Sequence, residues 1–299
     1  MTPVQAAKRI SFNEIMFLTD FSEPSCDALP FAMAIARGYG SRVHAVHVLL
    51  PSSYAYITPE MGAALMDSQE ECARAEMERV EAQLTGLSRD TVIERATSLW
   101  DVASRLIKER DIDLIVLGTH GRTGLKKALL GSSAEEVFRH SQVPVLMSGP
   151  AVRTGAHNGG HFRCVLFATD FNSVSSVAAP YAVSLAQENQ AQLILLHVLP
   201  QPKPGKSSKP PDLSVAEALH QLEALIPTEV DLRCRPRAEV LHGEPATQIL
   251  ETARQRGADL IVLGVRGLDG ITSVAARVQK DTAYEVVAHA PCPVLTVRG

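Results

Sequence analysis

Spaced glycines with basic residues between them follow an apolar run in the first half of the chain. The stretch reads DLIVLGTHGRTGLKKALLGSSAEEV, in which DLIVL is typical of a buried strand and SSAEEV of a helix start. Gly118 and Gly121 carry no Cβ atom, so a ligand can come close to their backbone N–H groups. Gly131, Ser132 and Ser133 precede the helix, whose free N–H groups and positive dipole end attract anions. These residue types and their spacing predict a phosphate-binding site.

The same residues also have a purely structural interpretation. Gly118 could simply end its strand. Ser133 and Glu136 form the pattern S-x-x-E, which predicts a capping box at a helix start that needs no ligand. The stretch is neither a GxGxxG nor a P-loop GxxxxGK[ST] motif. Taken singly, each glycine leaves both interpretations open.

A second copy of this stretch occurs later in the chain as DLIVLGVRGLDGITSVAARVQKDTAYEV, and it differs in its second half. His120 is replaced by Arg266, and the sequence KDT stands where the first copy has GSS. The carboxylate of Asp281 would repel a phosphate, whereas Thr282 and Glu285 keep the capping pattern. We therefore predict that the phosphate loop works in the first copy and is degenerate in the second.

Four sequence blocks recur in the same order in both halves of the chain, which identifies a tandem duplication. The blocks are residues 15–36, 43–49, 113–118 and 143–148 in the first copy, and residues 165–186, 193–199, 259–264 and 292–297 in the second. We expect one domain over residues 9–148 and another over residues 162–299. A stretch rich in glycine and histidine over residues 149–161 is the expected linker.

Within each copy, short apolar runs alternate with amphipathic helical patterns. Runs such as Val43–Leu49 and Leu114–Leu117 are almost entirely apolar, which is typical of parallel strands buried on both faces. Strands that alternate with helices predict right-handed βαβ units and an α/β fold with a parallel sheet. Ligands of such sheets bind at the carboxyl ends of the strands, where Gly118 ends its run.

Two further pairs of polar residues recur between the copies, namely Asp20 with Asp170 and His47 with His197. Asp20 follows the first strand, where its carboxylate could bind a ligand or cap the next helix. His47 and His197 lie within apolar strands, so we interpret them as core histidines bonded to the backbone and not as catalytic groups. We assign no catalytic residue and no metal-binding residue.

Composition excludes several other classes of protein. The net charge of −4, the pI near 6.2 and the 5% aromatic content argue against a nucleic-acid-binding surface. The five cysteines are scattered without a CxxC pair, which favours reduced thiols in a cytoplasmic protein. We find no apolar run long enough to span a membrane and expect no signal peptide.

The glycine motif and the strand sequences of this chain resemble those of the universal stress protein family. Its nucleotide-binding members carry G-x-x-G, nine residues and then G-[ST], and the spacing of Gly118, Gly121 and Gly131 matches that motif. LTDFSE resembles the first strand of the family, HVL the second, and VPVL the fifth. The resemblance covers nearly the whole chain as two family domains in tandem. The chain departs from the family at Leu18, where nucleotide-binding relatives often have proline.

The resemblance implies two Rossmann-like domains of the adenine nucleotide alpha hydrolase type, each with a five-stranded parallel sheet flanked by helices. It also implies that the first domain binds ATP, with or without Mg²⁺. Carried over residue by residue, the nucleotide site is formed by Thr19, Asp20, Val48, Leu117, Gly118, His120, Gly121, Arg122, Gly131, Ser132 and Ser133. Thr169, Asp170 and Val198 keep the base end of the second site.

The resemblance also implies that single-domain members form homodimers, in which the sheet edges formed by the fifth strands pair with each other. We expect Val143–Met147 to lie antiparallel to Pro293–Val297, so that the two domains form a pseudo-dimer within one chain. The function that follows is a regulatory, stress-response module that binds ATP. A slow ATPase or adenylyl-transfer enzyme and a nucleotide-free scaffold stay open as alternatives. A further homodimer and an unidentified protein partner also stay open.

Overall fold

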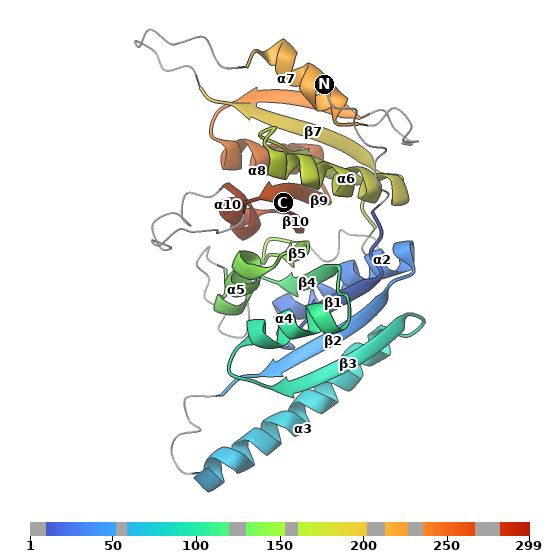
Figure 1. The fold of residues 1–299 in the computed structure, drawn as a ribbon, viewed down its shortest axis with the longest axis vertical. Coiled ribbons are helices and arrows are strands. Elements are labelled where there is room, and N and C mark those ends of the chain that lie inside the picture. Colours follow the sequence, from blue (N-terminus) through green and yellow to red (C-terminus); the bar gives the residue numbers. More distant parts are fainter. Residues whose placement is uncertain are drawn as a thin grey trace. The chain divides into compact units, whose positions relative to one another are not determined.

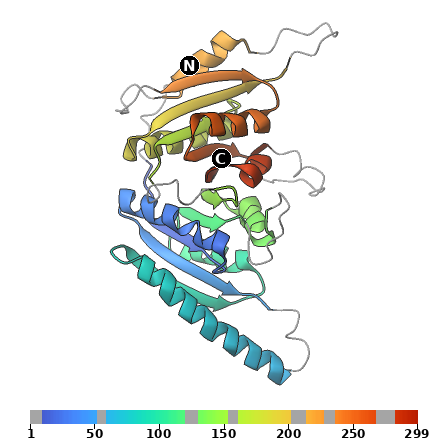
Figure 2. The same cartoon turned by 180° about the vertical axis from the view of Figure 1, so that it is seen from behind.

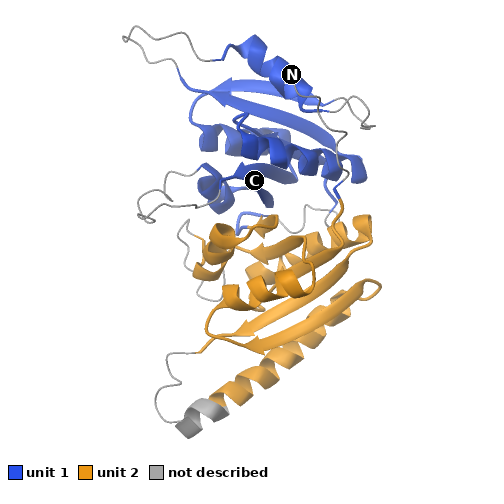
Figure 3. Ribbon diagram, viewed as in Figure 1, with its two compact units in different colours: residues 1–10, 149–299 blue, residues 11–148 orange. Residues whose placement is uncertain are grey.

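The computed structural model describes residues 10–51, 59–119, 130–152, 161–201, 213–226, 236–266 and 282–299, with the side chains of residues 59–64 excepted. The chain divides into two compact units (Figure 3). The first unit is Ser11–Ser148, and the second consists of Met1–Ile10 with Gly149–Gly299.

The first unit alternates strands and helices (Figure 1). Its elements are β1 (Glu14–Leu18), α1 (Glu23–Cys26), α2 (Leu29–Tyr39), β2 (Arg42–Leu49), α3 (Pro59–Gln83), β3 (Ser88–Arg95), α4 (Leu99–Glu109), β4 (Leu114–Gly118), α5 (Ser132–His140) and β5 (Val145–Ser148). The strands pair in parallel in the order β3-β2-β1-β4-β5. Figures 1 and 2 show α2 and α3 on one face of this sheet and α4 and α5 on the other.

The second unit repeats this plan. Its elements are β6 (Cys164–Ala168), α6 (Ser173–Glu188), β7 (Gln192–Leu199), α7 (Val215–Ala224), β8 (Arg237–His242), α8 (Pro245–Arg256), β9 (Leu260–Val265), α10 (Thr282–His289) and β10 (Val294–Arg298). All of its strand pairs are parallel, in the order β10-β9-β6-β7-β8.

The tandem duplication and the five-stranded parallel sheet in each copy are therefore confirmed. In each sheet the strand order reverses beside the first strand of the copy, which is β1 in the first unit and β6 in the second. Ligands of parallel sheets bind at such a switch point. The predicted pairing of the two fifth strands concerns the placement of one unit against the other, and it stays a prediction.

The core of each unit lies where helices cover both faces of its central strands. Ile15, Met16 and Phe17 of β1 are fully buried, as are Leu114 and Ile115 of the neighbouring β4. Burial of one such side chain contributes about 1.5–3 kcal/mol relative to an exposed position. The unbroken apolar runs of the sequence thus become strands that are covered on both sides, and the chain leaves the sheet at their polar carboxyl ends.

Candidate functional site

A cavity of about 280 Å³ opens at the carboxyl ends of β1, β2 and β4 in the first unit. Its walls are Leu18, Thr19, Asp20, Ser25, Val48, Leu50, Leu99, Leu117, Gly118, Thr119, Gly131, Ser132, Ser133 and Ala134. The structure thus brings together the predicted site residues that it describes. Those that lie outside the described residues are His120, Gly121 and Arg122.

The turn after β1 holds Thr19 and Asp20 in a defined direction. Phe21 has a φ of 61°, a left-handed conformation that costs a non-glycine residue about 1–2 kcal/mol. Two contacts offset this cost. The backbone N–H of Phe21 donates to Thr19 Oγ1 over 3.0 Å, and the Phe21 ring packs on the His47 ring with centroids 4.4 Å apart. Contacts within the protein therefore hold this turn in place without a ligand.

The imidazole of His47 supports the same turn. Its Nδ1 lies 2.8 Å from the backbone oxygen of Thr19, and since a carbonyl only accepts, Nδ1 donates. His197 makes the same bond to the oxygen of Thr169, also over 2.8 Å. The interpretation of both histidines as core residues bonded to the backbone is confirmed.

Asp20 prepares the start of α1 and also faces the cavity. Its Oδ1 accepts from the backbone N–H of Ser22 over 3.0 Å and from Ser22 Oγ over 2.5 Å. Ser22 is the N-cap of α1, and its hydroxyl oxygen accepts from the N–H of Ser25. The helix is therefore capped by Ser22, while the Asp20 carboxylate orients that cap. The two interpretations of Asp20, as a residue that orients the helix cap and as a residue that contacts a ligand, are therefore compatible.

Gly118 is required by backbone packing. A Cβ atom at this position would lie 2.5 Å from the backbone oxygen of Pro24, at the start of α1. Gly264 occupies the same place in the second unit, where a Cβ would lie 2.9 Å from the backbone nitrogen of Ser175. Both distances are shorter than a real Cβ atom tolerates. Glycine at these positions therefore allows α1 to contact β4 in the first unit and α6 to contact β9 in the second.

The start of α5 differs from the predicted capping box. Gly131 is the N-cap, in extended backbone conformation with φ −61° and ψ 151°, and its N–H donates to the oxygen of Thr119 over 2.8 Å. Ser133 therefore lies inside the first turn and cannot cap it. The carboxylate of Glu136 instead accepts from Ser98 Oγ over 3.2 Å. The capping-box prediction for this helix is wrong, because tertiary contacts make Gly131 the last residue before the helix.

A glycine cap leaves donors at the helix start. Gly131 has no side chain to accept from the first-turn N–H groups. Within the described part of the chain, no hydrogen bond joins the N–H or hydroxyl groups of Ser132 and Ser133 to another residue. These donors and the positive end of the helix dipole lie at the cavity wall. The arrangement can bind an anion.

Some lining residues carried no signal in the sequence. Leu50 follows β2, and Leu99 is the first residue of α4. Leu99 comes from the helix after β3, so only the folded sheet places it in the same cavity wall as Gly118 and Gly131. Its neighbour Ser98 is the N-cap of α4, which a serine before an apolar helical pattern could have indicated.

The Cys26 thiol near this site is not an activated nucleophile. Burial raises its pKa above the ordinary value, and the nearby carboxylates of Asp20, Asp27 and Glu76 raise it further. A raised thiol pKa leaves little thiolate near neutral pH.

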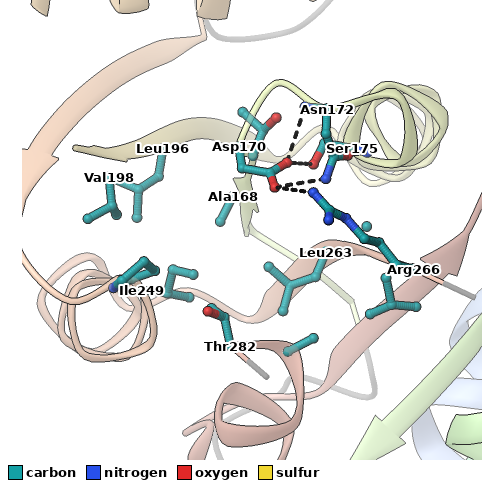
Figure 4. A pocket seen from close by; sticks show the side chains of 15 residues that line it. Ala168, Asp170, Asn172, Ser175, Leu196, Val198, Ile249, Leu263, Arg266 and Thr282 are labelled. Atoms are coloured by element: carbon teal, nitrogen blue, oxygen red, sulfur yellow. Dashed lines mark hydrogen bonds and ion pairs between the residues drawn. The ribbon is translucent and has the colours of Figure 1, made fainter. Parts of the chain in front are cut away.

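A second cavity, of about 410 Å³, opens at the carboxyl ends of β6, β7 and β9 (Figure 4). Its walls are Ala168, Thr169, Asp170, Asn172, Ser175, Leu196, Val198, Pro245, Ile249, Leu263, Gly264, Val265, Arg266, Thr282 and Ala283. Thr169, Asp170 and Val198 thus occupy the positions that Thr19, Asp20 and Val48 hold in the first unit. Phe171 repeats the left-handed turn with a φ of 61°.

The predicted degenerate phosphate loop of this copy lies outside the described residues, which resume at Thr282, the first residue of α10. The pattern of Thr282 and Glu285 is therefore untested as a capping box, because the residue before the helix is not described.

Within the described residues, no group of three or more histidine, cysteine, aspartate or glutamate side chains is placed to hold a metal ion. No helix in the described part of the chain is both long enough and apolar enough to cross a membrane.

Comparison with known proteins places this geometry in a family. A model of the Universal stress protein family matches residues 11–148 and again residues 161–298. A universal stress protein of Thermus aquaticus is 35% identical over 140 residues, which are 46% of this chain and 99% of that protein. One of Mycolicibacterium smegmatis is 26% identical over 298 residues, covering 95% of this chain and 96% of that protein. A crystal structure of a universal stress protein from Archaeoglobus fulgidus shares the fold with a TM-score of 0.72 at 22% identity, over 97% of this chain and 99% of that one.

Proposed function

The chain belongs to the universal stress protein family with two of its domains in tandem, and on this premise we propose that the first unit binds ATP as a regulatory ligand. One observation carries the proposal: the N–H donors at the start of α5 have no side-chain cap. They line the same cavity as the Asp20 carboxylate and a set of apolar side chains. One cavity therefore offers contacts for the three chemically different parts of a nucleotide.

The apolar part of the cavity suits a purine base. Leu18, Val48, Leu50 and Leu117 come from the ends of β1, β2 and β4 and give the cavity an apolar wall. Small-molecule pockets are lined mainly by such side chains, with a few polar groups that fix orientation. Here the polar groups beside the wall are Thr19 and Asp20. A carboxylate such as Asp20 accepts from the hydroxyl groups of a ribose or the amino group of a base.

The phosphates would lie at the start of α5. The N–H groups and hydroxyls of Ser132 and Ser133 are donors, and the helix dipole adds roughly half a positive charge at this end. Among the described lining residues, Asp20 is the carboxylate that a Mg²⁺ ion bound to the nucleotide could use, since Mg²⁺ commonly combines one or two carboxylates with substrate phosphates. These residues fit ATP with or without the metal ion.

A regulatory role is favoured over rapid turnover. Phosphoryl transfer needs a group that positions or deprotonates the attacking nucleophile. The carboxylate of Asp20 already accepts two hydrogen bonds from Ser22 at Oδ1, which directs it toward the start of α1. A slow ATPase or an adenylyl-transfer enzyme, and a scaffold that binds no nucleotide, are the alternatives that the experiment below separates from this proposal.

The test is mass spectrometry of the nucleotide released from the purified chain, combined with titration calorimetry of added ATP. Gly131→Val places a branched side chain at the cavity wall, and it should abolish binding of ATP in the first unit. Gly38→Val is the matched control, because a Cβ at Gly38 on α2 meets no atom within 4 Å.

Loss of ATP in Gly131→Val but not in Gly38→Val supports the proposal. Release of ADP in place of ATP would favour turnover, and a hydrolysis assay would follow. Wild-type protein that neither releases nor binds ATP would refute the proposal and favour the scaffold.

A further inference from the structure

The amino ends of β1, β2 and β3, opposite the first cavity, hold a buried histidine among charged side chains. His44 of β2 is 3% exposed. Its Nε2 lies 2.7 Å from Oε2 of Glu14, the first residue of β1, and its Nδ1 lies 2.8 Å from Nη1 of Arg110, which follows α4. Arg110 also donates to the carboxylate of Asp90 on β3. We call these four residues the His44 cluster.

These contacts fix the protonation state of the His44 ring. A guanidinium only donates, so Nδ1 accepts the bond from Arg110 and carries no proton. Nε2 then carries the proton of the neutral ring and donates it to Glu14. His44 is therefore neutral in this arrangement, and both of its ring nitrogens are bound.

The Nδ1 atom of His44 has a second acceptor within reach. Oδ2 of Asp90 lies 3.6 Å from it, too far for a hydrogen bond while Arg110 occupies the space between their elements. Burial raises the pKa of Asp90, but the hydrogen bond and the charge of Arg110 outweigh burial and hold that pKa below its ordinary value. Asp90 is therefore an acceptor throughout the range of about pH 5 to 8 in which histidines ordinarily change charge.

The charged side chains around the cluster are exposed or have other partners. Lys108 and Asp111, on either side of Arg110 in the sequence, are exposed. Among the described residues, the groups that can exchange at His44 are therefore Glu14, Asp90 and Arg110. The flanking pairs are Asp113 with the backbone N–H groups of Asn13 and Glu14, Arg105 with Glu94 and Glu109, and Arg42 with Ser88.

The second unit keeps the arginine and replaces the histidine. Arg256 stands at the position of Arg110, and its Nη2 lies 3.0 Å from Oε1 of Glu239 on the outer strand β8. Ile194 stands at the position of His44. A bond from this arginine to a carboxylate of the outer strand is thus common to both units and needs no histidine. The titratable ring is what the first unit adds.

We propose that the His44 cluster is a pH-sensitive latch for the end of α4. While His44 is neutral, Arg110 bonds both His44 and Asp90 and holds the end of α4 on the sheet. A proton taken up from solvent at Nδ1 turns this acceptor into a donor that faces the donors of Arg110. The ring then donates to Asp90, Arg110 moves into solvent, and the imidazolium lies between the carboxylates of Glu14 and Asp90.

The helix α4 connects this latch with the first cavity. Its first residue, Leu99, lies in the cavity wall, and its N-cap, Ser98, donates to Glu136 of α5. Release of the other end of α4 in acid loosens an element of that wall. The latch residues lie outside the cavity, so the proposal stands whether or not ATP is the ligand there.

The test follows the ring and the helix end in the full-length chain. Long-range proton–nitrogen NMR of the histidine rings identifies His44 by the signals that are missing in His44→Gln. We expect a proton on Nε2 alone at about pH 7.5 and on both ring nitrogens at about pH 5. Hydrogen exchange, corrected for the intrinsic effect of pH, follows the amide of Ile112, which donates to Ile107 at the end of α4. Its protection should fall about tenfold between the two pH values.

The second unit supplies a control within the same molecule. The amide of Ala258 makes the corresponding bond at the end of α8, and it should keep its protection at both pH values. In His44→Gln the protection of Ile112 should no longer depend on pH, because glutamine takes up no proton in this range. His220→Gln, at an exposed position of α7, is the matched control and should behave as wild type.

Arg110→Gln removes the latch and leaves the buried ring in place. It should lower the protection of Ile112 at both pH values, and wild-type protection in this variant would overturn the proposal. The proposal is also overturned by a proton on Nδ1 of His44 at about pH 7.5, or by protection of Ile112 in wild type that does not change with pH. A change that Ala258 shares equally, or that persists in His44→Gln, would overturn it as well.

Discussion

Replacing Ser132 with aspartate should abolish tight binding of ATP to the first unit while the fold stays intact. Ser132 is the first residue of α5 and lies at the cavity wall, beside the donors assigned to the phosphates. The substitution also mimics the second copy, whose sequence has Asp281 at the corresponding position. It introduces one negative charge without a large change in side-chain volume.

The expected magnitude follows from Coulomb's law. Two unit charges about 5 Å apart repel by about 3 kcal/mol at an effective dielectric constant of about 20. This corresponds to a loss of about 100-fold in affinity for ATP. The effect on the helix has the opposite sign, because an acidic residue in the first turn stabilises a helix by about 0.3–1 kcal/mol. Loss of binding in this variant therefore cannot be ascribed to loss of α5.

The assay is titration calorimetry with ATP, together with thermal unfolding of the ligand-free protein. Ser132→Asn is the control, because asparagine has the shape of aspartate without its charge. We expect the asparagine variant to bind ATP nearly as wild type does, and the aspartate variant to unfold at the wild-type temperature or above. Equal affinities of the two variants for ATP would refute the assignment of the phosphates to the start of α5.

Two further predictions concern stability. Gly118→Ala should lower the free energy of unfolding of the first unit by about 1–3 kcal/mol, because its Cβ would overlap the backbone oxygen of Pro24. Gly38→Ala, which removes a glycine from the open face of α2, should raise that free energy by about 0.5–1 kcal/mol, and urea titration of both variants measures the contrast. Burial, with the nearby Asp259 carboxylate, raises the pKa of Cys164 from 9.0 to about 11. The folded state then holds a proton that the unfolded state releases, so the contribution of Cys164 to stability is complete below pH 9.0 and is lost as the pH rises through about 11. Urea midpoints measured across this range should fall more steeply in wild type than in Cys164→Ala, and parallel slopes would contradict the pKa assignment.

The sequence alone predicted the duplication, the parallel sheet of each copy and the position of Gly118 at the end of a strand. These features depend on local patterns. An apolar run such as Leu114–Leu117 can satisfy its burial only inside a covered sheet, and a strand that ends in glycine before a helix start marks the ligand edge of that sheet. The hydrogen bonding of His47 and His197 was also predictable, because an imidazole buried within such a run needs a hydrogen-bond partner, which both find in the backbone.

The roles of individual groups at the site were decided by tertiary structure. The pattern of Ser133 and Glu136 indicated a capping box, yet the bond from the N–H of Gly131 to Thr119 starts the helix earlier, and Glu136 turns to Ser98. The packing role of Gly118 depends on Pro24, which lies far from it in the sequence. Likewise, only the fold brings Arg266 beside Asp170 at the wall of the second cavity. Hydrophobic periodicity is a property of neighbours along the chain, whereas caps, close backbone contacts and ion pairs depend on which strand ends meet at one edge of the sheet.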